Sequence, residues 1–328
     1  MRNFKFSLTL LPLALAATAQ AQVSGAGATF PELLYNNWAK EYKASGGVAV
    51  NYQGIGSGGG IKAITAKTVD FGASDSPMNA EERQGAPKIL HLPMCAGAVV
   101  VAYNAPGVPN GLKLTGAVIA DIFLHKIITW NDGRIAGLNP SIKLPASRIV
   151  TVSRSDSSGT TAIFTNYLAK VSPVFKTGIG EGKSVNWTKG GLAGKGNPGV
   201  AAFIKQTPGA IGYIELAFAD KNAITYAHVQ NLQKNFSAPT LASTSAAVAG
   251  VKLPADFCAM ATNTSDPNGY PITGFTWILL YPDAKPEVKR FLHWCLTTGQ
   301  KSAAKYDYAP LPAGVQSRVL NALKKIGG

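Results

Sequence analysis

Two stretches of this chain share one design, in which a strand leads into a loop rich in glycine and serine and then into a helix. In the first, apolar and polar residues alternate over Val48–Tyr52, and the loop spans Gly54–Gly60. In the second, Arg148–Val152 predicts the strand and Ser153–Gly159 the loop. Strands that alternate with helices indicate an α/β protein with mainly parallel sheets.

The helices expected around these loops have recognisable starts. One helix should follow Gly60, and another should follow the second loop, with apolar residues on one face as far as Val171. Thr29–Glu32 has the pattern of a capping box with proline in the first turn. Asn197–Pro198 predicts the cap of a further helix, which leads to the apolar strand Ala210–Ile214.

Two long apolar runs predict strands that cross between two lobes. They are Val99–Tyr103 and Phe275–Tyr281, about one-third and five-sixths of the way along the 328 residues. The first lobe would then be discontinuous, built from residues 22–98 and 276–328, and the second would span residues 99–275. This length suits two lobes, since domains usually run to about 100–200 residues.

The first 21 residues have the layout of a secretory signal peptide. Arg2 and Lys5 give a positive start, Phe6–Ala17 is apolar, and Ala19–Ala21 is an A-x-A cleavage site. The apolar run is too short to span a bilayer, which takes about 20 residues. We therefore expect cleavage after Ala21 and export of the mature protein.

The charge of the mature chain suits an anionic ligand. The signal segment holds two basic residues and no acidic one, so 29 of the 31 basic residues remain against 17 acidic ones, and the formal charge falls from +14 to +12. A basic surface can steer anions toward a protein. Nucleic acid is excluded as a partner because the protein is exported and its lysines are scattered, for example Lys113, Lys143, Lys205 and Lys252.

The residue patterns that would indicate a metal centre or an enzyme are missing from the sequence. Cys95, Cys258 and Cys295 lie far apart with no C-x-x-C pair, and the four histidines are isolated. G-x-S-x-G and H-E-x-x-H do not occur, and Asp70–Gly72 resembles a kinase motif without the H-R-D loop that would accompany it. We expect no catalytic function, no metal and no cofactor.

The glycine-rich loops instead predict an anion site. A helix N-terminus offers unpaired backbone N–H groups and the positive end of the helix dipole. Glycine lets the backbone approach closely, serine and threonine add hydroxyl donors, and Arg154 lies beside one loop. The alternative is a dinucleotide site, since Gly54-x-Gly56-x-x-Gly59 follows a strand and Asp75 lies 16 residues beyond it. That alternative leaves the loop at Arg154 unexplained.

Seven motifs follow one another in a distinctive order along the chain. They are Gly25-Ala-Gly-Ala-Thr-Phe-Pro31, Asn51-Tyr-Gln-Gly-Ile-Gly-Ser57, Val69-Asp-Phe-Gly-Ala-Ser-Asp75, Arg154-Ser-Asp-Ser-Ser-Gly-Thr160, Gly194-Lys-Gly-Asn197, Pro208-Gly-Ala-Ile-Gly-Tyr213 and Asp307-Tyr-Ala-Pro-Leu-Pro312. In order and spacing these motifs resemble those of one family, the phosphate-binding proteins of the bacterial Pst transporter (PstS). The resemblance covers nearly the whole mature chain and thins only between about residues 222 and 268.

This resemblance implies a type II periplasmic-binding-protein fold, with two lobes of mainly parallel sheet joined by a two-strand hinge. It also implies a monomer that captures inorganic phosphate in the periplasm and delivers it to the permease subunits of an ABC transporter. Arg154 would supply the cation, held in place by Asp156, and backbone N–H groups and hydroxyls would donate the other bonds. The implied ligand contacts are Thr29, Phe30, Ser57, Asp75, Arg154, Ser158, Gly159 and Thr160.

The sequence also departs from the family pattern. Ser153 stands where relatives often carry a second arginine, Ser157 replaces a glycine, and Gly58 stands where a serine is usual. Two alternatives within the same architecture stay open: a sulfate or molybdate receptor, and a secreted phosphate scavenger that works without a transporter. The resemblance places Cys258 and Cys295 on two late helices, and we hypothesise that they pair in a disulfide.

Overall fold

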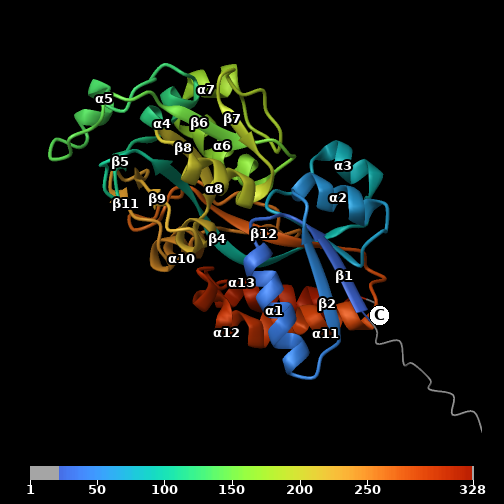
Figure 1. Ribbon diagram of the computed structural model, residues 1–328. Helices are drawn as coiled ribbons and strands as arrows, with labels where there is room; N and C mark the ends of the chain where they lie inside the picture. The colour runs from blue at the N-terminus through green and yellow to red at the C-terminus, as the bar shows by residue number, and fades with distance from the viewer. Residues whose placement is uncertain (1–21, 327–328) are drawn as a thin grey trace, which may run out of the picture.

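One curved sheet of nine strands runs through the molecule, and helices cover both of its faces (Figure 1). The computed structural model describes residues 22–326, so the predicted signal peptide lies outside the described residues. The strand order is β2-β1-β3-β12-β4-β8-β6-β7, with β9 paired to β4 off this path, while β11, β10 and β5 form a smaller sheet. The strands are β1 Gln22–Gly27, β2 Ala49–Gly54, β3 Phe71–Ser74, β4 Leu90–Asn104, β5 Lys113–Leu114, β6 Val150–Arg154, β7 Leu192–Gly194, β8 Ala210–Glu215, β9 Thr225–Tyr226, β10 His228–Gln230, β11 Phe236–Ser237 and β12 Thr273–Leu280.

The helices fill most connections between the strands and also follow the last strand. Within residues 22–326 none is long and apolar enough to cross a bilayer. A π-helical turn at Cys295–Gly299 and a 3-10 turn at Ala304–Tyr306 accompany them. The α-helices are α1 Glu32–Ala44, α2 Ser57–Thr65, α3 Ala80–Gly85, α4 Gly116–Phe123, α5 Gly133–Ala136, α6 Gly159–Val171, α7 Pro173–Gly178, α8 Gly196–Gln206, α9 Leu216–Lys221, α10 Leu241–Ala249, α11 Pro286–Trp294, α12 Gln300–Ala303 and α13 Ala313–Lys324.

Strand β4 changes its partner along its length, and this divides the sheet into two halves. Residues 90–98 pair antiparallel with β12, and residues 99–104 pair antiparallel with β8. We call β2, β1, β3 and β12 the N-terminal half, and β8, β6 and β7 the central half. Both predicted crossing runs therefore belong to neighbouring antiparallel strands, β4 and β12, in the middle of the sheet.

The N-terminal half joins the two ends of the chain. Strand β1 pairs in parallel with β2 and β3. Helix α1 lies beside the C-terminal helices (Figure 1), where the rings of Tyr42 and Phe291 have centroids 5.4 Å apart. The indole Nε1 of Trp38 donates a hydrogen bond of 2.9 Å to Gly299 O. The segment that includes α11 and Gly299 thus completes the core that α1 begins.

The central half is held by an aromatic cluster between its strands and helices. Strand β6 pairs in parallel with β7 and β8. The rings of Phe164 on α6 and Tyr213 on β8 stack with centroids 4.3 Å apart, and Phe123 on α4 meets Phe164 edge-on at 5.0 Å. The predicted α/β organisation is confirmed, with parallel pairing on either side of antiparallel β4 and β12.

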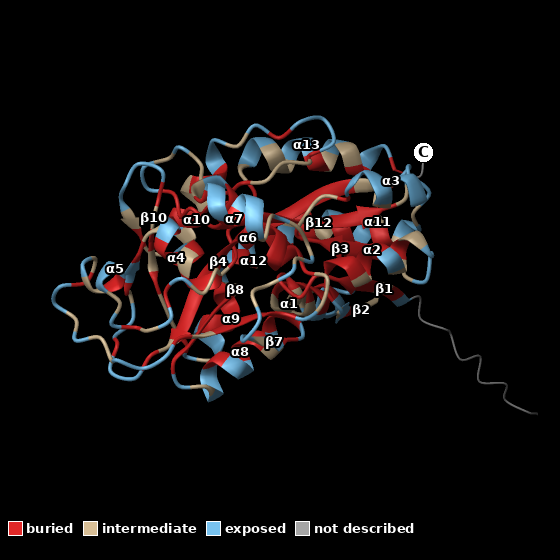
Figure 2. Ribbon diagram, turned by 90° about the horizontal axis from the view of Figure 1, so that it is seen from above, coloured by how far each residue is buried: buried red, intermediate tan, exposed pale blue. Residues whose placement is uncertain are grey.

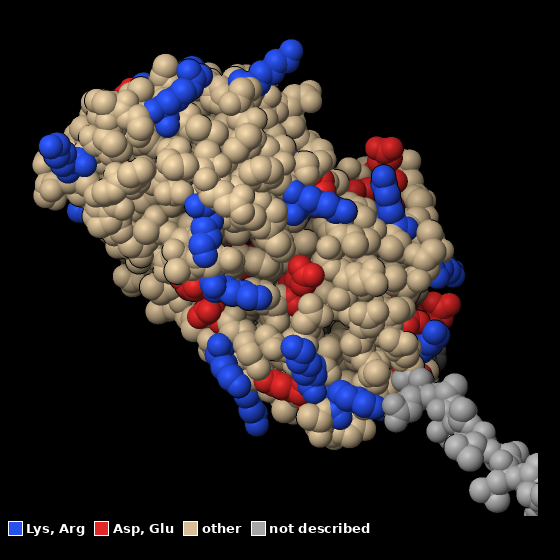
Figure 3. Space-filling view, in the orientation of Figure 1, with Lys and Arg blue, Asp and Glu red and all other residues tan. Residues whose placement is uncertain are grey.

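The buried core continues along β4 from one half to the other (Figure 2). Every residue from His91 to Tyr103 is buried, and so is all of β12. Strands buried on both faces consist of near-continuous apolar runs, which is why these two segments stand out in the sequence. Most charged side chains lie on the surface instead, with Asp75, Arg154 and Glu215 as buried exceptions. On the face shown in Figure 3 acidic residues are interspersed among the basic ones.

Three local predictions are wrong. The capping box at Thr29 does not form, because α1 begins at Glu32 after Pro31 without a side-chain cap. Asn197 does not cap α8, which begins at Gly196 after Lys195. Helix α2 begins at Ser57 rather than after Gly60, because packing against β1 and β3 overrides the low helix propensity of glycine.

The hypothesis that Cys258 and Cys295 form a disulfide is also wrong. All three cysteines are free in the structure. Cys258 Sγ accepts a hydrogen bond of 3.0 Å from Arg83 Nη2, whereas Cys295 is buried at the end of α11. Burial raises the pKa of the Cys258 thiol to about 11, so the thiolate needed for disulfide exchange is scarce at neutral pH.

Candidate functional site

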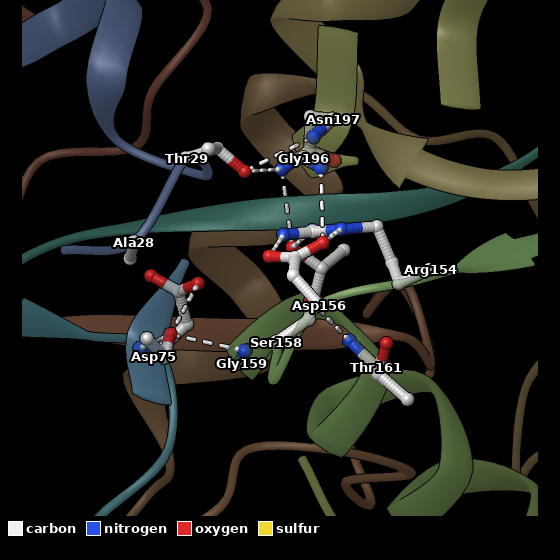
Figure 4. Close-up of polar contacts among 12 residues, drawn as sticks. Ala28, Thr29, Asp75, Arg154, Asp156, Ser158, Gly159, Thr161, Gly196 and Asn197 are labelled. Atoms are coloured by element: carbon white, nitrogen blue, oxygen red, sulfur yellow. Dashed lines mark hydrogen bonds and ion pairs between the residues drawn. The ribbon is translucent and has the colours of Figure 1, made fainter. Parts of the chain in front are cut away.

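The loops that follow the parallel strands of both halves meet at one place between the halves (Figure 4). Ligands of open α/β sheets bind outside the carboxyl ends of the strands, so this convergence marks the candidate site. The N-terminal half supplies loops after β1, β2 and β3, and the central half supplies loops after β6 and β7. The residues brought there are Thr29, Phe30, Ser57, Asp75, Arg154, Ser158, Gly159 and Thr160.

Ser57 connects the two halves. Its Oγ accepts hydrogen bonds from the N–H of Asp75 at 3.2 Å and from the N–H of Gly159 at 3.0 Å. A Cβ on Gly159 would lie 2.5 Å from this oxygen, so only glycine allows the approach. Gly58 N–H also donates to Ser157 O across the same boundary, at 3.0 Å. The halves are therefore in direct polar contact in this structure.

The glycine-rich loop before α2 packs against protein rather than framing space for a dinucleotide. A Cβ on Gly56 would lie 2.3 Å from Asp156 Oδ2, and one on Gly58 would lie 2.3 Å from Ser157 Oγ. Gly56 also has a φ of 86°, which favours glycine. These glycines let α2 approach the central half, so the geometry does not support the dinucleotide alternative.

Arg154 is the buried cation of the site, and Asp156 fixes its orientation. Its side chain is 1% exposed; Nε donates to Asp156 Oδ1 at 2.8 Å and Nη2 to Asp156 Oδ2 at 2.5 Å. Burial acts to raise the pKa of Asp156, but the hydrogen bonds and charge of Arg154 outweigh it, and the pKa lies below its usual value. The arrangement expected from the sequence is therefore present.

Arg154 keeps donor groups free after these bonds. Its Nη1 donates to Thr160 Oγ1 at 3.3 Å. A guanidinium has five N–H groups, and three are used here, so one remains on each of Nη1 and Nη2. Two neighbouring N–H groups of this kind can bind two oxygens of one oxyanion.

Asn197 belongs to the site, although the sequence pattern predicted it as a helix cap and the family resemblance did not include it among the ligand contacts. Its backbone N–H and its Nδ2 both donate to Thr29 Oγ1 at 3.0 Å, and Nδ2 also donates to Thr160 Oγ1 at 3.1 Å. Its Oδ1 accepts from Glu215 N–H at 2.9 Å. The motif that contains Asn197 was visible in the sequence, but its partners lie up to 168 residues away.

Two buried hydroxyls of the site, those of Thr29 and Thr160, can act only as donors toward a ligand. A hydroxyl has two acceptor lone pairs and one proton. Thr29 Oγ1 accepts twice from Asn197, and Thr160 Oγ1 accepts from Arg154 and Asn197, so each has only its O–H left to offer. Ser57 Oγ also accepts twice, but its O–H already donates to Asp75 Oδ2 at 3.4 Å.

Phe30, Ser158 and Gly159 contribute in other ways. The ring of Phe30 is fully buried, and Tyr308 Oη donates to Phe30 O at 2.6 Å, so the backbone N–H is its remaining polar group. Ser158 caps α6, with its Oγ accepting from Thr161 N–H at 3.1 Å. Gly159 N–H, which the family resemblance implies as a ligand contact, donates to Ser57 here.

Asp75 is the acceptor among these donors. It is 1% exposed, and within the described chain its Oδ1 has no hydrogen-bond partner. Burial raises the pKa of Asp75 from 3.8 to about 7, although Thr276, Arg154 and Ser57 act in the opposite direction. A buried carboxyl oxygen without a partner suits a ligand that brings a proton of its own. The site as a whole therefore fits a protonated oxyanion.

Comparisons with known proteins agree on one family. Residues 14–298 match the family model of the PBP superfamily domain. The phosphate-binding protein PstS of Haemophilus influenzae is 42% identical over 310 residues, which cover 92% of this chain and 92% of the relative. That of Pasteurella multocida is 43% identical over 305 residues, with 90% and 88% covered. The chain belongs to the PstS family.

Solved structures show the same fold as this PstS-family chain. A high-affinity periplasmic phosphate-binding protein crystallised with phosphate superimposes with a TM-score of 0.73 at 24% identity, covering 91% of this chain and 93% of the other. The phosphate-binding protein from Stenotrophomonas maltophilia gives 0.74 at 20% identity, covering 92% and 94%. The predicted type II periplasmic-binding-protein fold is confirmed.

The raised pKa of Asp75 predicts how pH affects the stability of the phosphate-free protein. The folded state holds the Asp75 proton up to about pH 7, while the unfolded chain releases it near 3.8. The contribution of Asp75 to stability is therefore complete below about pH 4 and is lost as pH rises to about 7, by up to about 4 kcal/mol. Asp75→Asn removes this loss.

Scanning calorimetry in phosphate-free buffer from pH 4 to pH 7 measures the effect. Other titrating groups such as Asp156 and Glu215 are common to both proteins, so the comparison uses the difference in Tm between wild type and variant. We expect the Tm of Asp75→Asn, relative to that of wild type, to increase as pH rises. A difference in Tm that does not change with pH would contradict the buried, protonated state of Asp75.

Proposed function

We propose that this protein binds inorganic phosphate between two lobes in the periplasm and delivers it to the permease subunits of an ABC transporter. The single observation that carries the proposal is a set of buried hydroxyl and N–H donors that comes from both halves, with Asp75 as the acceptor among them. The PstS names of relatives at 42–43% identity support the same ligand. Cleavage after Ala21 and a monomeric state are part of the proposal, as is a role in transport without catalysis.

We take the lobes to be residues 22–98 with 276–328, and residues 99–275. The change of partner along β4 between residues 98 and 99 supports the first boundary. The proposed ligand residues come from both lobes, so neither lobe alone completes the site. They are Thr29, Phe30, Ser57 and Asp75 from the first lobe, and Arg154, Ser158, Gly159 and Thr160 from the second.

Closure of the lobes would offset the cost of burying the ion. Removing a phosphate from water is unfavourable unless its oxygens are fully hydrogen-bonded. The hydroxyls, the free N–H groups of Arg154 and the helix N-terminus of α6 would provide these bonds, and Gly159 N–H would turn from Ser57 to the ion. A hinge between lobes would also change the outer face on loading, which a permease could recognise.

Asp75 favours phosphate over sulfate or molybdate within this architecture. Near neutral pH phosphate carries at least one proton that it can donate to the Oδ1 left unpaired in the structure. Sulfate carries no proton, so above the Asp75 pKa of about 7 its oxygen would face the carboxylate lone pairs without a proton between them. Delivery to a permease rather than scavenging is supported by a solved structure described as a phosphate ABC transporter substrate-binding protein, with a TM-score of 0.65.

The proposed function predicts that Arg154 is needed for phosphate binding through both charge and geometry. Arg154→Ala should weaken phosphate affinity by at least about 100-fold, because it removes charged hydrogen bonds and leaves the partly buried Asp156 without its ion-pair partner. Arg154→Lys should recover only part of the affinity, since an ammonium cannot donate two parallel bonds. Arg148→Ala, at an exposed arginine, is the control for charge.

Isothermal calorimetry with inorganic phosphate on the mature protein measures these affinities. Wild type and Arg148→Ala should bind alike. If Arg154→Ala binds within about twofold of wild type, Arg154 does not contact the ion. If wild type shows no binding at all, the proposed function itself is wrong.

The contact between lobes predicts a second residue that supports closure. Lys183 Nζ lies 2.7 Å from Glu82 Oε2, with side chains only 10% and 22% exposed. Lys183 O also accepts from Ser158 N–H at 2.8 Å. The ion pair joins α3 of the first lobe to a loop of the second, so it can form only when the lobes are together.

Lys183→Met should therefore weaken phosphate binding by about 5- to 30-fold, as expected for loss of a partly buried ion pair. It should also raise the radius of gyration of the phosphate-saturated protein toward that of the phosphate-free form, measured by solution scattering. Lys176→Met, at an exposed lysine of α7, is the matched control. Equal affinities for Lys183→Met and wild type would show that the pair does not stabilise the closed form.

A further inference from the structure

Asn197 makes four hydrogen bonds from a fully buried position at the start of α8. Glu215 N–H can only donate, so the amide atom that faces it at 2.9 Å must be Oδ1. This fixes the orientation of the side chain, and Nδ2 must point toward the hydroxyls of Thr29 and Thr160. The amide therefore has one arrangement that satisfies all its partners.

The surroundings of Asn197 hold it in this arrangement. Glu215 Oε2 accepts from Ala217 N–H at 2.8 Å, so the backbone that binds Oδ1 is itself anchored at the start of α9. Gly196, the residue before Asn197, donates its N–H to Asp156 Oδ1 at 2.9 Å. Its φ of 67° lies in the region that favours glycine, and this turn directs the N–H groups of both residues into the site.

The bonds of Asn197 determine where two hydroxyl protons can point. Both lone pairs of Thr29 Oγ1 are taken by Asn197, and those of Thr160 Oγ1 are taken by Asn197 and Arg154. Neither hydroxyl can then accept from a ligand, and neither can donate back to a nitrogen whose hydrogen already points at it. The O–H of each threonine is therefore left for a ligand, and Figure 4 shows Thr29, Arg154 and Asp75 around one common space.

We propose that Asn197 is a positioning residue. By donating to the hydroxyls of Thr29 and Thr160 it leaves each O–H to donate to the bound anion, and it does so only when the lobes are closed. The inference rests on the proposed function and names a residue beyond the ligand contacts. Thr29 lies in the first lobe and Asn197 in the second, so opening breaks both bonds to Thr29. Closure of the lobes is therefore what lets Asn197 fix the Thr29 hydroxyl as a donor to the ligand.

Asn197→Asp tests this directly because it keeps the size of the side chain and the acceptor for Glu215 N–H. It replaces the Nδ2 donor with an oxygen that accepts, so the hydroxyls of Thr29 and Thr160 can turn toward residue 197 and away from the ion. Calorimetry with inorganic phosphate should show an affinity at least about 100-fold lower than that of wild type. Asn197→Ala, which frees one lone pair on each hydroxyl without reversing the bonds, should lose less.

Two controls separate this role from charge and from folding. Lys195→Gln changes the charge by one unit at the exposed residue that precedes Gly196, and it should bind phosphate within about threefold of wild type. Circular dichroism and Tm of each phosphate-free variant report whether it folds. If wild type fails to bind phosphate, the proposed function falls and this inference falls with it. If wild type binds and Asn197→Asp stays within about threefold, this inference alone is overturned.

A double-mutant cycle decides the matter even if Asn197→Asp does not fold. Phosphate affinities are measured for wild type, Asn197→Ala, Thr160→Val and the double variant. If Asn197 acts through the Thr160 hydroxyl, the loss of phosphate affinity caused by Asn197→Ala should be at least threefold smaller in the Thr160→Val background than in wild type. If the loss of affinity in the double variant equals the product of the two single losses within about twofold, Asn197 acts independently of Thr160 and the inference is overturned.

Discussion

The ion pair between Arg154 and Asp156 is the interaction on which the rest of the site depends. Asp156 holds the guanidinium in one orientation and also accepts the N–H of Gly196, so it connects the loop after β6 to the start of α8. The next residue, Asn197, reaches Thr29 in the other half of the sheet. The Asp156 carboxylate thus fixes the orientation of Arg154 and the position of the α8 start. Through Asn197 it also supports one contact between the lobes.

This arrangement also sets the charge that a ligand meets. The charge of Arg154 is balanced by Asp156, and burial favours a proton on Asp75 near neutral pH. The protein therefore offers an anion oriented dipoles and hydroxyls more than net positive charge. Hydrogen bonds of this kind depend on geometry, so they are lost together when the lobes separate, which suits a receptor that must release its ligand.

The sequence predicted the features whose causes are local or repeated along the chain. Alternation of strands and helices gave the fold class, and the buried runs at Val99–Tyr103 and Phe275–Tyr281 marked the middle of the sheet. The pairing of Arg154 with Asp156 was expected from the family resemblance. Those two residues are two positions apart, so their contact needs little beyond the loop itself.

The features that the sequence missed depend on distant partners. Thr29 has the pattern of a helix cap, but its hydroxyl is taken by Asn197, 168 residues away, and the capping box does not form. Glycines at the start of α2 suggested a loop, yet a Cβ on Gly60 would lie 2.5 Å from Gly27 Cα, so close packing on the sheet explains them. Such contacts follow from the tertiary fold and have no signature in a short window of sequence.

The central claim is that this site receives an anion that carries a proton, and ligand selectivity at pH 8 tests it most directly. At that pH Asp75 is mostly ionised, phosphate still has one proton to donate, and sulfate has none. Calorimetry should show wild type binding phosphate at least about 1,000-fold more tightly than sulfate, since sites built around one hydrogen bond reject analogues that lack it. Asp75→Asn should narrow this ratio by at least about tenfold. Wild type that binds sulfate within about tenfold of phosphate would contradict the account.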